Sequence, residues 1–442
     1  MTTSLTANHK RVTRLTSCDS QPHHNNILAL LALVMPMLMP LSALCQNTLA
    51  STTPPSLTQR YYDGDYATVA NQGAALLLIQ PWDNELRYFV ANSLAWTGRT
   101  DEAIPQYQAL DGTTFSHEAQ LGLANIYRWN GRPDRAQPLY QQVLNDQPDN
   151  KDAVNGLILT QRELRPKTSI SVENFHDSDQ TSTHSLALKQ QWRASDTAQQ
   201  IEIEADVAQN TRPGLNQNQS DLTLRYANPN ALLEPKAEVS LQTTPDSRLF
   251  GKLSLSLSGT PLAITAGRVN WAKLAQNPFA IAQGLTANDI GGNIDYTSTL
   301  GRWRATYLAS EISDANLVQD ASFLYTPAWQ PFTSPDIKAY VGVNGHKARF
   351  ATPLYWSPAP GNYYGLIGLN AEWVSTVWSN VVAAQYGLPL SAGITSSWSL
   401  TAGAHRHLGQ DWALGIDLTA QSAQRSTAYS AQYVTFSLEK LW

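Results

Sequence analysis

The chain has 442 residues and a formal net charge of −5, so it is long enough for two or three domains and lacks the broad basic surface that nucleic acid binding requires. Charged residues make up 15% of the chain, a low share for a soluble protein, yet the mean hydropathy of −0.30 is far from that of a helical membrane protein. A large β-barrel fits both values, because its strands alternate apolar with small polar residues.

Residues 1–45 are predicted to be an export signal. Basic residues precede an uncharged apolar run at 27–44, and small residues then precede a cleavage site after Cys45. Two alternatives remain open, namely a retained membrane helix and a lipid-modified Cys45. Proline within the apolar run argues against a straight spanning helix. The basic residues are Lys10, Arg11 and Arg14, and the prolines are Pro36 and Pro40.

Residues 46–56 are predicted to be a linker between this signal and the first folded domain. Cys18 and Cys45 are the chain's cysteines, and both would leave with the signal. The mature chain is therefore expected to form no disulfide and to carry out no thiol chemistry.

Residues 57–165 show helical spacing and an internal repeat with a period of 33 to 34 residues. The clearest unit places small and aromatic residues where two helices would cross closely, turns at a glycine and ends at a proline. This pattern resembles the tetratricopeptide repeat, which implies a short α-solenoid with a concave binding groove. The repeat-defining residues are Gly98 and Gly131, Ala103 and Ala136, Tyr107 and Tyr140, together with Tyr127 and Pro148.

Asn92 and Asn125 occupy the same place in successive repeats, and Arg128 lies close to the second of them. Amide side chains on a concave face can bind the backbone of an extended peptide, so we predict these three residues to line the groove. The alternative is that they are solvated or cap a neighbouring turn.

After Pro166 the helical spacing stops and alternation with a period of two continues to the end of the chain, which predicts strands. The final strand places Phe436, Leu438 and Trp442 on one face, a pattern that resembles the assembly signal of outer-membrane barrels. With strands of ~9–11 residues, residues 167–442 would form an antiparallel transmembrane barrel of about 14 to 16 strands. The chain is thus predicted to be multidomain, α then β.

If the apolar faces of these strands contact lipid, the opposite faces line the lumen. Neither sign of charge predominates among the candidate lumen residues, which are Glu202, Glu204, Asp206, Arg225, Arg302 and Arg304. Paired carboxylates can cleave glycosides, but any water-filled lumen needs polar residues, so no catalytic residue is assigned. His405 and His407 lie in HRHLGQD, a predicted turn without a third ligand, so neither a metal nor a cofactor is expected.

The segment Tyr355-Trp356-Ser357-Pro358, followed by Asn362-Tyr363-Tyr364, resembles an element in the barrels of the cellulose-synthase C-subunit family and of related small outer-membrane barrels. Repeats of that family also resemble the run Arg128-Trp129-Asn130-Gly131-Arg132. Physically, Ser-Pro starts a loop, and Tyr-Trp beside it is expected at a membrane edge. The array is shorter here than in cellulose exporters, so another protein would have to bridge the periplasm.

We therefore expect a non-enzymatic channel in the outer membrane of a Gram-negative bacterium, with its repeats in the periplasm. The resemblance implies a part in exopolysaccharide export, with a cellulose-like or amino-sugar polymer as cargo. The expected partners are outer-membrane lipid, the barrel assembly machinery, synthase components and the polysaccharide itself. The alternative is a plugged barrel that acts as an anchor, surface receptor or binding module, with residues 271–292 forming an inward-folded or a surface loop.

Overall fold

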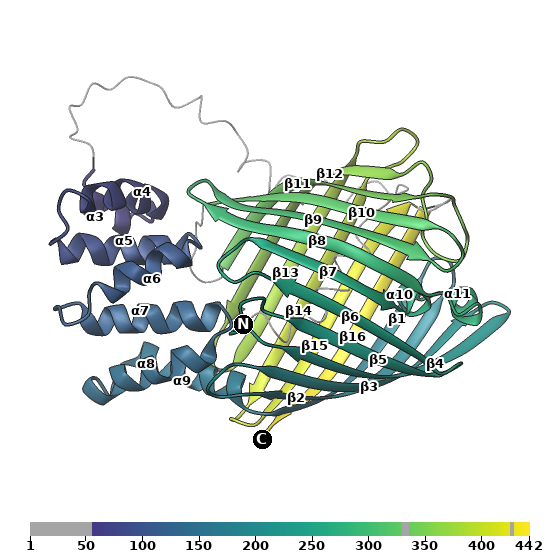
Figure 1. Ribbon diagram of the computed structural model, residues 1–442, viewed down its shortest axis with the longest axis horizontal. Helices are drawn as coiled ribbons and strands as arrows, with labels where there is room; N and C mark the ends of the chain where they lie inside the picture. Colours follow the sequence, from purple (N-terminus) through teal and green to yellow (C-terminus); the bar gives the residue numbers. More distant parts are fainter. Residues whose placement is uncertain (1–54, 329–335, 425–427) are drawn as a thin grey trace, which may run out of the picture.

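The structure is a computed structural model that describes residues 55–328, 336–424 and 428–442. The predicted export signal and most of the predicted linker lie outside these residues. A helical domain is followed by a β-barrel, and the change from helix to strand falls between Leu164 and Lys167. The helices stand at one end of the barrel (Figure 1). We call this the proximal end and the opposite one the distal end.

The helical domain contains seven helices within the described residues. They follow one another as a stack of antiparallel pairs that runs across the proximal end (Figure 1). Their bounds are α3 Leu57–Tyr62, α4 Tyr66–Leu77, α5 Asn84–Trp96, α6 Thr100–Gln108, α7 Ser116–Trp129, α8 Pro133–Asp146 and α9 Lys151–Leu164.

Glycine determines both the turns and the close approaches within this stack. Gly64, Gly98 and Gly131 each have a positive φ, of 82°, 79° and 71°, which other residues rarely adopt, and they turn the chain between paired helices. At Gly156 a Cβ atom would lie 2.3 Å from Cε1 of Tyr140, a ring that is fully buried. The missing side chain therefore lets α9 pack directly on the Tyr140 ring of α8.

The barrel contains sixteen strands, each antiparallel to its neighbours, and closes where β1 pairs with β16. The count agrees with the upper end of the predicted range. The strands are β1 Lys167–Asp177, β2 Ser182–Arg193, β3 Gln200–Arg212, β4 Leu215–Ala227, β5 Lys236–Thr244, β6 Arg248–Ser256, β7 Leu262–Val269, β8 Ala287–Ser298, β9 Gly301–Ile312, β10 Leu317–Pro327, β11 Asp336–Ala348, β12 Asn362–Val374, β13 Trp378–Pro389, β14 Ser397–Leu408, β15 Trp412–Gln424 and β16 Ala428–Leu441.

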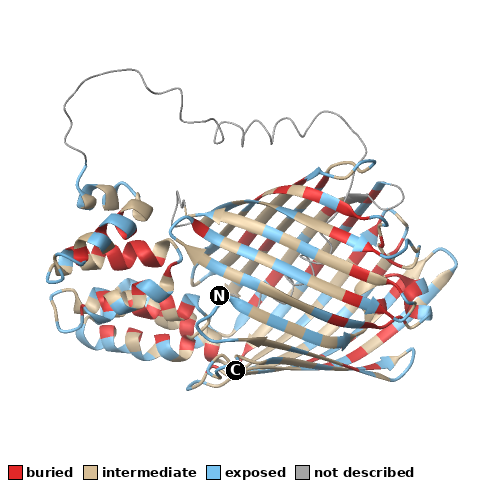
Figure 2. Cartoon of the chain, turned by 45° about the horizontal axis from the view of Figure 1, so that its top comes forward, coloured by how far each residue is buried: buried red, intermediate tan, exposed pale blue. Residues whose placement is uncertain are grey.

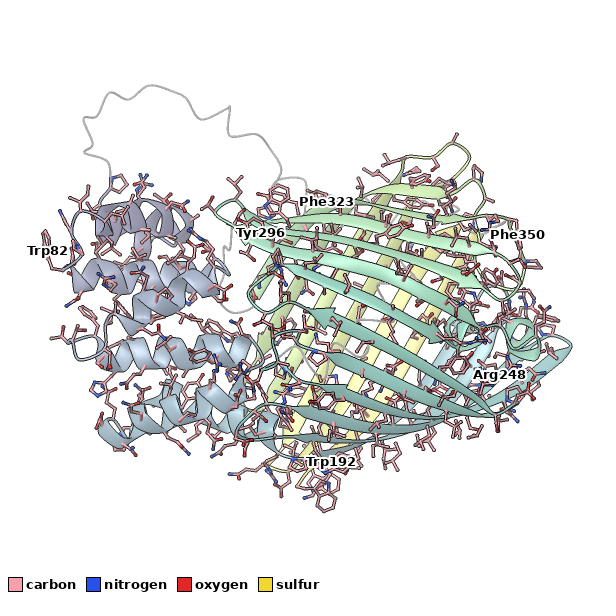
Figure 3. All side chains as sticks on the ribbon, in the orientation of Figure 1. Trp82, Trp192, Arg248, Tyr296, Phe323 and Phe350 are labelled. Carbon is pink, nitrogen blue, oxygen red and sulfur yellow. The ribbon has the colours of Figure 1, made fainter. Side chains whose placement is uncertain are left out.

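The two faces of the barrel wall differ as the alternation predicts. Ile201 and Ile203 of β3 are 45% and 40% exposed on the outer face, whereas Glu204 and Asp206 are buried on the inner one. Buried positions gather inside the helical domain and at the distal end of the barrel (Figure 2). Aromatic side chains mark both ends of the outer wall, with Trp192 toward the proximal end and Phe350 at the distal end (Figure 3).

The last residue fastens the closure of the barrel. Trp442 donates from its indole nitrogen to Oγ1 of Thr168 at 2.8 Å and from its backbone nitrogen to the carbonyl of Pro166 at 2.9 Å. Lys440, the charged exception on the apolar face of β16, lies over the rings of Trp412 and Trp442, with its Nζ 4.9 and 5.6 Å from their centroids. A cation at this edge is stabilised by the aromatic faces.

Two arginines attach the helical domain to the barrel rim, namely Arg162 in α9 and Arg165 directly after this helix. Arg162 donates to the carbonyl of Thr376 at 2.5 Å and to that of Gly409 at 3.1 Å. Arg165 donates to Asp411 at 2.7 Å, and this hydrogen bond lowers the pKa of that carboxyl.

The far part of the helical stack approaches the rim at a second point. A Cβ atom on Gly98, in the turn between α5 and α6, would lie 3.8 Å from the methyl group of Thr297 at the end of β8. In the order of sixteen strands, β8 is eight places from β16 in either direction. The stack therefore reaches from the β1–β16 closure to the opposite side of the proximal mouth.

Replacing Gly156 with alanine is expected to destabilise the helical domain, because the new methyl group overlaps the buried Tyr140 ring. Overpacking costs ~1–3 kcal/mol, which lowers the unfolding temperature of a domain of this size by roughly 4 °C or more. Far-ultraviolet circular dichroism of the folded protein in detergent follows this transition. Lys151→Ala, at an exposed position of the same helix, is the control. An unchanged or higher transition for Gly156→Ala would contradict the packing, since alanine is otherwise favoured over glycine in a helix.

Replacing Arg162 and Arg165 together with glutamine is expected to loosen the helical domain from the barrel rim, because five backbone carbonyls and Asp411 lose these charged donors. Spin labels on cysteines introduced at the exposed positions Asp111 and Ser258 measure the distance between the two domains. The labelled parent should give one narrow distance distribution and the labelled double variant a broad one. Lys151→Gln is the control, and equally narrow distributions in all three proteins would show that the arginines do not hold the junction.

Candidate functional site

The connection between β7 and β8 folds into the barrel instead of continuing outward. Residues 270–286, which we call the strap, carry two short helices, α10 Trp271–Ala275 and α11 Pro278–Ala282. Both lie at the distal end (Figure 1). Asn270 and Asn277 begin these helices by accepting hydrogen bonds from the backbone nitrogens of Lys273 and Phe279. Of the two conformations predicted for this region, the structure has the inward-folded one.

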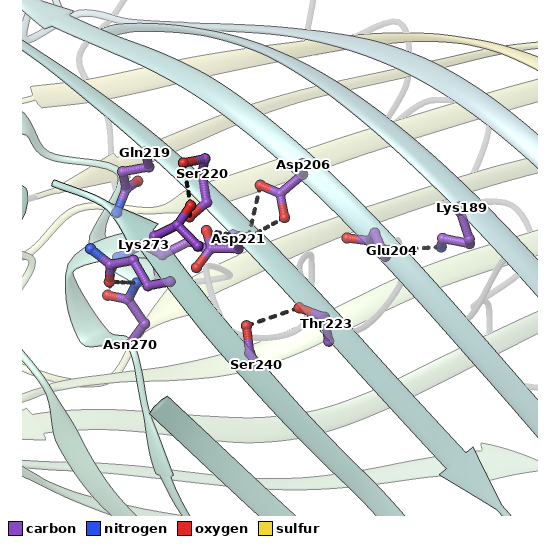
Figure 4. Close-up of polar contacts among 12 residues, drawn as sticks. Lys189, Glu204, Asp206, Gln219, Ser220, Asp221, Thr223, Ser240, Asn270 and Lys273 are labelled. Atoms are coloured by element: carbon purple, nitrogen blue, oxygen red, sulfur yellow. Dashed lines mark hydrogen bonds and ion pairs between the residues drawn. The ribbon is translucent and has the colours of Figure 1, made fainter. Parts of the chain in front are cut away.

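Lys273 fixes the strap to the wall formed by β3 and β4. Its Nζ lies 2.7 Å from Oδ1 and 2.9 Å from Oδ2 of Asp206, and 3.0 Å from Oδ2 of Asp221 (Figure 4). The two aspartates are directly opposite each other in the pairing of these strands, and their side chains are only 7% and 1% exposed. One ammonium group is thus shared by two adjacent buried carboxylates.

The middle of the strap crosses the lumen to the opposite wall. Gln276, which adopts a left-handed φ of 51°, accepts a hydrogen bond of 3.1 Å from the hydroxyl of Tyr433 on β16. The strap originates between β7 and β8, and β8 is eight strands from β16 by either route. The strap therefore bridges the full width of the barrel.

A second inward segment, residues 349–361 between β11 and β12, packs on the strap. Asn277 donates to the carbonyl of Pro353 at 3.1 Å, and the rings of Trp271 and Tyr355 meet edge to face at 5.6 Å. The hydroxyl of Tyr355 donates to Asp314 in the connection between β9 and β10 at 2.7 Å. Three distal connections thus form one packed layer.

The motif Tyr355-Trp356-Ser357-Pro358 lies in this layer, so the expectation that its aromatic residues mark a membrane edge is wrong. Tyr355 is 6% exposed, and Trp356 stacks on His346 of β11 with ring centroids 3.8 Å apart. Trp356 also packs against a buried cluster inside the barrel formed by Phe175, Tyr364, Leu366, Tyr429 and Ala431. Burying these rings inside the barrel favours the inward fold of the loop.

Ion pairs cover the inner face of β2 to β5 between the strap and the proximal end. Arg225 donates to Glu202 at 2.6 Å, to Glu204 at 2.9 Å and to Glu238 at 2.8 Å. Lys189 lies 3.3 Å from Glu204. Glu202 and Glu204 are therefore engaged by cations, which is unlike the free acid and base pair that glycoside hydrolysis requires.

The other predicted lumen residues lie on a different part of the wall. Arg302 donates to Asp295 at 2.6 Å, and Arg304 donates to the same carboxylate at 3.3 Å. Arg302 and Arg304 lie on the face of β9 opposite Tyr307, which is 47% exposed outside. The inner wall therefore presents both signs of charge, arranged in separate clusters.

The residues predicted to line a groove in the helical domain are engaged in its packing. Asn125 accepts a hydrogen bond of 2.6 Å from the hydroxyl of Tyr140, and Asn92 accepts one from Tyr107 and donates to Tyr61 at 2.9 Å. Their amide groups thus link successive helices, which is neither the solvated position nor the capping role of the alternative.

Arg128 is 6% exposed and lies 3.6 Å from Glu163 of α9. It joins α7 to the last helix of the domain. A groove role for Arg128 and for the two asparagines stays a prediction, since each is already held by neighbours.

The other predicted residues belong to the helical repeat and to the final strand. Ala103, Tyr107, Ala136 and Tyr140 are buried at helix crossings, and Tyr127 is half-buried. Pro148 lies just after α8, which ends at Asp146. Phe436, Leu438 and Trp442 lie on the outer face, 52%, 39% and 64% exposed.

The prediction that His405 and His407 lie in a turn is wrong. Strand β14 continues to Leu408, and His405 lies 3.1 Å from Asp417 of β15. Continued backbone pairing with β15 overrides the local turn signal. Within the described segments, no group of three or more His, Cys, Asp or Glu side chains is arranged to hold a metal ion.

Sequence reasoning missed the residues that fasten the strap. Lys273, Asp221, Gln276 and Tyr433 carry no motif, and their positions in the chain are far apart. The one available signal was the break in alternation at residues 271–292, because an interrupted strand pattern marks a long connection.

No helix in the described part of the chain has both the length and the apolar character needed to cross a membrane. No protein-family model matches the chain, and no curated protein matches its sequence. Among solved structures, the barrel is similar to a bacterial polysaccharide outer membrane secretin, with 12% identity and a TM-score of 0.50. The match covers 63% of this chain and 99% of that one. The chain carries an outer-membrane type β-barrel.

Two further solved structures are similar to the barrel. OccK1 of Pseudomonas aeruginosa matches at 9% identity with a TM-score of 0.33, over 63% of this chain and 99% of that one. The CymD monoaromatic hydrocarbon channel matches at 10% identity with a TM-score of 0.34, over 64% of this chain and 91% of that one. At these identities the likeness concerns the fold alone.

Replacing Arg225 with glutamine is expected to increase the preference of the lumen for cations, because three carboxylates lose their shared counter-charge. The permeability ratio of K⁺ over Cl⁻, obtained from reversal potentials in a salt gradient, should rise roughly two-fold or more. Arg406→Gln removes the same charge from the outer face, where Arg406 lies over Trp378, and should leave the ratio unchanged. An equal ratio in all three proteins would show that ions do not pass this wall.

Proposed function

We propose that the chain is an outer-membrane conduit that takes part in the export of an exopolysaccharide. One observation carries this proposal: a helical stack stands across one mouth of a sixteen-stranded barrel whose inner face is polar. A polymer that leaves the periplasm would meet the stack before it enters the lumen. The similar solved structure is a bacterial polysaccharide outer membrane secretin, which supports the same cargo class.

We infer that the proximal end is periplasmic. Bacterial outer-membrane barrels have short periplasmic turns and longer extracellular loops. Here the connection between β8 and β9 is short and proximal, whereas residues 270–286 and 349–361 are long and distal. The last strand also ends beside the helical domain, as an even number of strands requires.

The helical pairs would act as tetratricopeptide repeats that bind a periplasmic partner or the emerging polymer. The recurring Tyr–Asn hydrogen bonds and the turning glycines support a true structural repeat. We further propose that the protein is not an enzyme, because Glu202 and Glu204 are held in ion pairs with Arg225. The expected partners are lipid, the barrel assembly machinery and synthase components.

A second candidate function is a plugged barrel that acts as an anchor or surface receptor. The strap favours it, because Gln276 reaches the opposite wall and the distal connections pack into one layer. The two functions differ in whether the strap ever leaves the lumen.

Single-channel conductance in planar bilayers tests the conduit. The folded protein is compared with a variant in which a short Gly-Ser linker replaces residues 271–285. Closely spaced, large conductance steps in the linker variant, with rare openings in the parent, are expected for a conduit. Removing residues 46–165 should alter the access of added polymer without abolishing ion flow. Silence of the linker variant, when gel mobility shows a folded barrel, would leave the anchor as the function.

A further inference from the structure

The strap is held to the wall of β3 and β4 by an ion pair that any other primary ammonium group can also form. We propose that Lys273 holds the place of an ammonium group of the cargo, so that a polymer with free amino groups competes for Asp206 and Asp221 and releases the strap. This inference rests on the proposed export function and names a cargo class for it, an amino-sugar polymer that is at least partly unacetylated.

The two aspartates require a cation. They are cross-strand partners on β3 and β4, with side chains 7% and 1% exposed. Like charges directly opposite in a sheet repel, and burial strengthens the repulsion. If Lys273 leaves, another cation must replace it or one carboxyl must take up a proton. The two aspartates thus favour exchange of Lys273 for another ammonium group over release of Lys273 without a replacement.

Lys273 leaves part of this site unused. Oδ1 of Asp221 has no hydrogen-bond partner among the described residues, and neither has Nε2 of Gln219, although both residues are only 4% exposed. Gln219 lies beside the lysine and the aspartates (Figure 4). One buried acceptor and one buried donor remain beside the ammonium, which suits an amino sugar that carries hydroxyl groups next to its amine.

The strap has separate contacts at its ends, in its middle and with the distal layer. Its ends are fixed near their own strands, where Asn270 donates to Gln242 at 2.7 Å and Arg248 donates to the carbonyl of Gly284. Its middle meets the far wall through the hydrogen bond between Gln276 and Tyr433, and Gln276 has the left-handed φ of 51° that non-glycine residues rarely adopt. Loss of the Lys273 ion pair would therefore detach α10 from the wall of β3 and β4, while α11 stays packed in the distal layer.

Carboxylates lead from the proximal side toward this site. Glu202, Glu204 and Asp206 follow one another on the inner face of β3, with neighbours ~7 Å apart along the strand. Arg225 and Lys189 neutralise the first two. A cationic polymer moving outward would exchange with these side-chain cations before it reaches Lys273.

The test uses the folded full-length protein in planar bilayers and two probes of equal length. A β-1,4-linked glucosamine hexamer carries an ammonium on each sugar, and the N-acetylglucosamine hexamer carries none. Added on the side of the helical domain, the glucosamine hexamer should raise the open probability by about tenfold, a change that a modest difference in affinity for the two states produces. The acetylated hexamer should leave it unchanged.

Variants distinguish the effect of losing the strap's ion pair from the effect of losing any positive charge in the lumen. Lys273→Gln should open the channel without any probe, and Lys273→Arg should keep it closed. Arg302→Gln is the matched control, because it removes the same charge from the inner wall without touching the strap or the carboxylates of β3. In Asp206→Asn/Asp221→Asn the channel should be open, and the glucosamine hexamer should have no further effect.

The outcomes distinguish failure of the proposed competition for Asp206 and Asp221 from failure of the conduit function. Equal responses to both hexamers, or equal opening by Lys273→Gln and Arg302→Gln, would overturn the competition and leave the conduit standing. No conductance from the variant with the Gly-Ser linker would overturn the conduit itself. A response to glucosamine that persists in the double asparagine variant would show that the amine acts elsewhere in the lumen.

Discussion

The backbone of a chain in lipid must satisfy every hydrogen bond within the protein, and the rest of this structure depends on that constraint. Pairing of β1 with β16 leaves no free edge, and it brings the first and last residues of the barrel to the same rim. Trp442 is therefore available to accept a hydrogen bond from Arg165. The closure that satisfies the backbone also creates the site where the helical domain docks.

A closed barrel of sixteen strands encloses more space than its own inward side chains fill, and two features occupy it. Along β2 to β5, acidic and basic side chains pair across strands, so each of these charged groups has a partner of opposite sign inside the barrel. At the distal end, residues 270–286 and 349–361 fold inward and bury aromatic rings. The ion pairs and the apolar distal layer thus occupy different positions along the barrel axis. Lys273 of the strap connects them through its ion pairs with Asp206 and Asp221.

In the helical domain, glycines allow the helices to pack closely against tyrosine rings. Gly122 and Gly156 admit the rings of Tyr107 and Tyr140, and the hydroxyl of each ring then reaches an asparagine of the preceding helix. Burial raises the pKa of both phenols, so each stays a neutral donor. This repeated contact produces a stiff stack that extends from Arg165 to Gly98 across the proximal mouth, and Trp82 projects from its far side (Figure 3).

The sequence by itself determined the local periods: alternation predicts strands with one outer and one inner face, and the 33 to 34 residue repeat predicts paired helices that end near Leu164. These features depend on neighbours in the chain, so a single sequence contains them. Tertiary structure alone decided that Asn92 and Asn125 bond to tyrosines, that Trp356 turns into the barrel, and that His405 stays in a strand. It also decided that Lys273 binds Asp206 and Asp221, which are more than fifty positions away in the chain. Barrel closure and strand register bring these side chains within hydrogen-bond distance, and no local pattern encodes either of them.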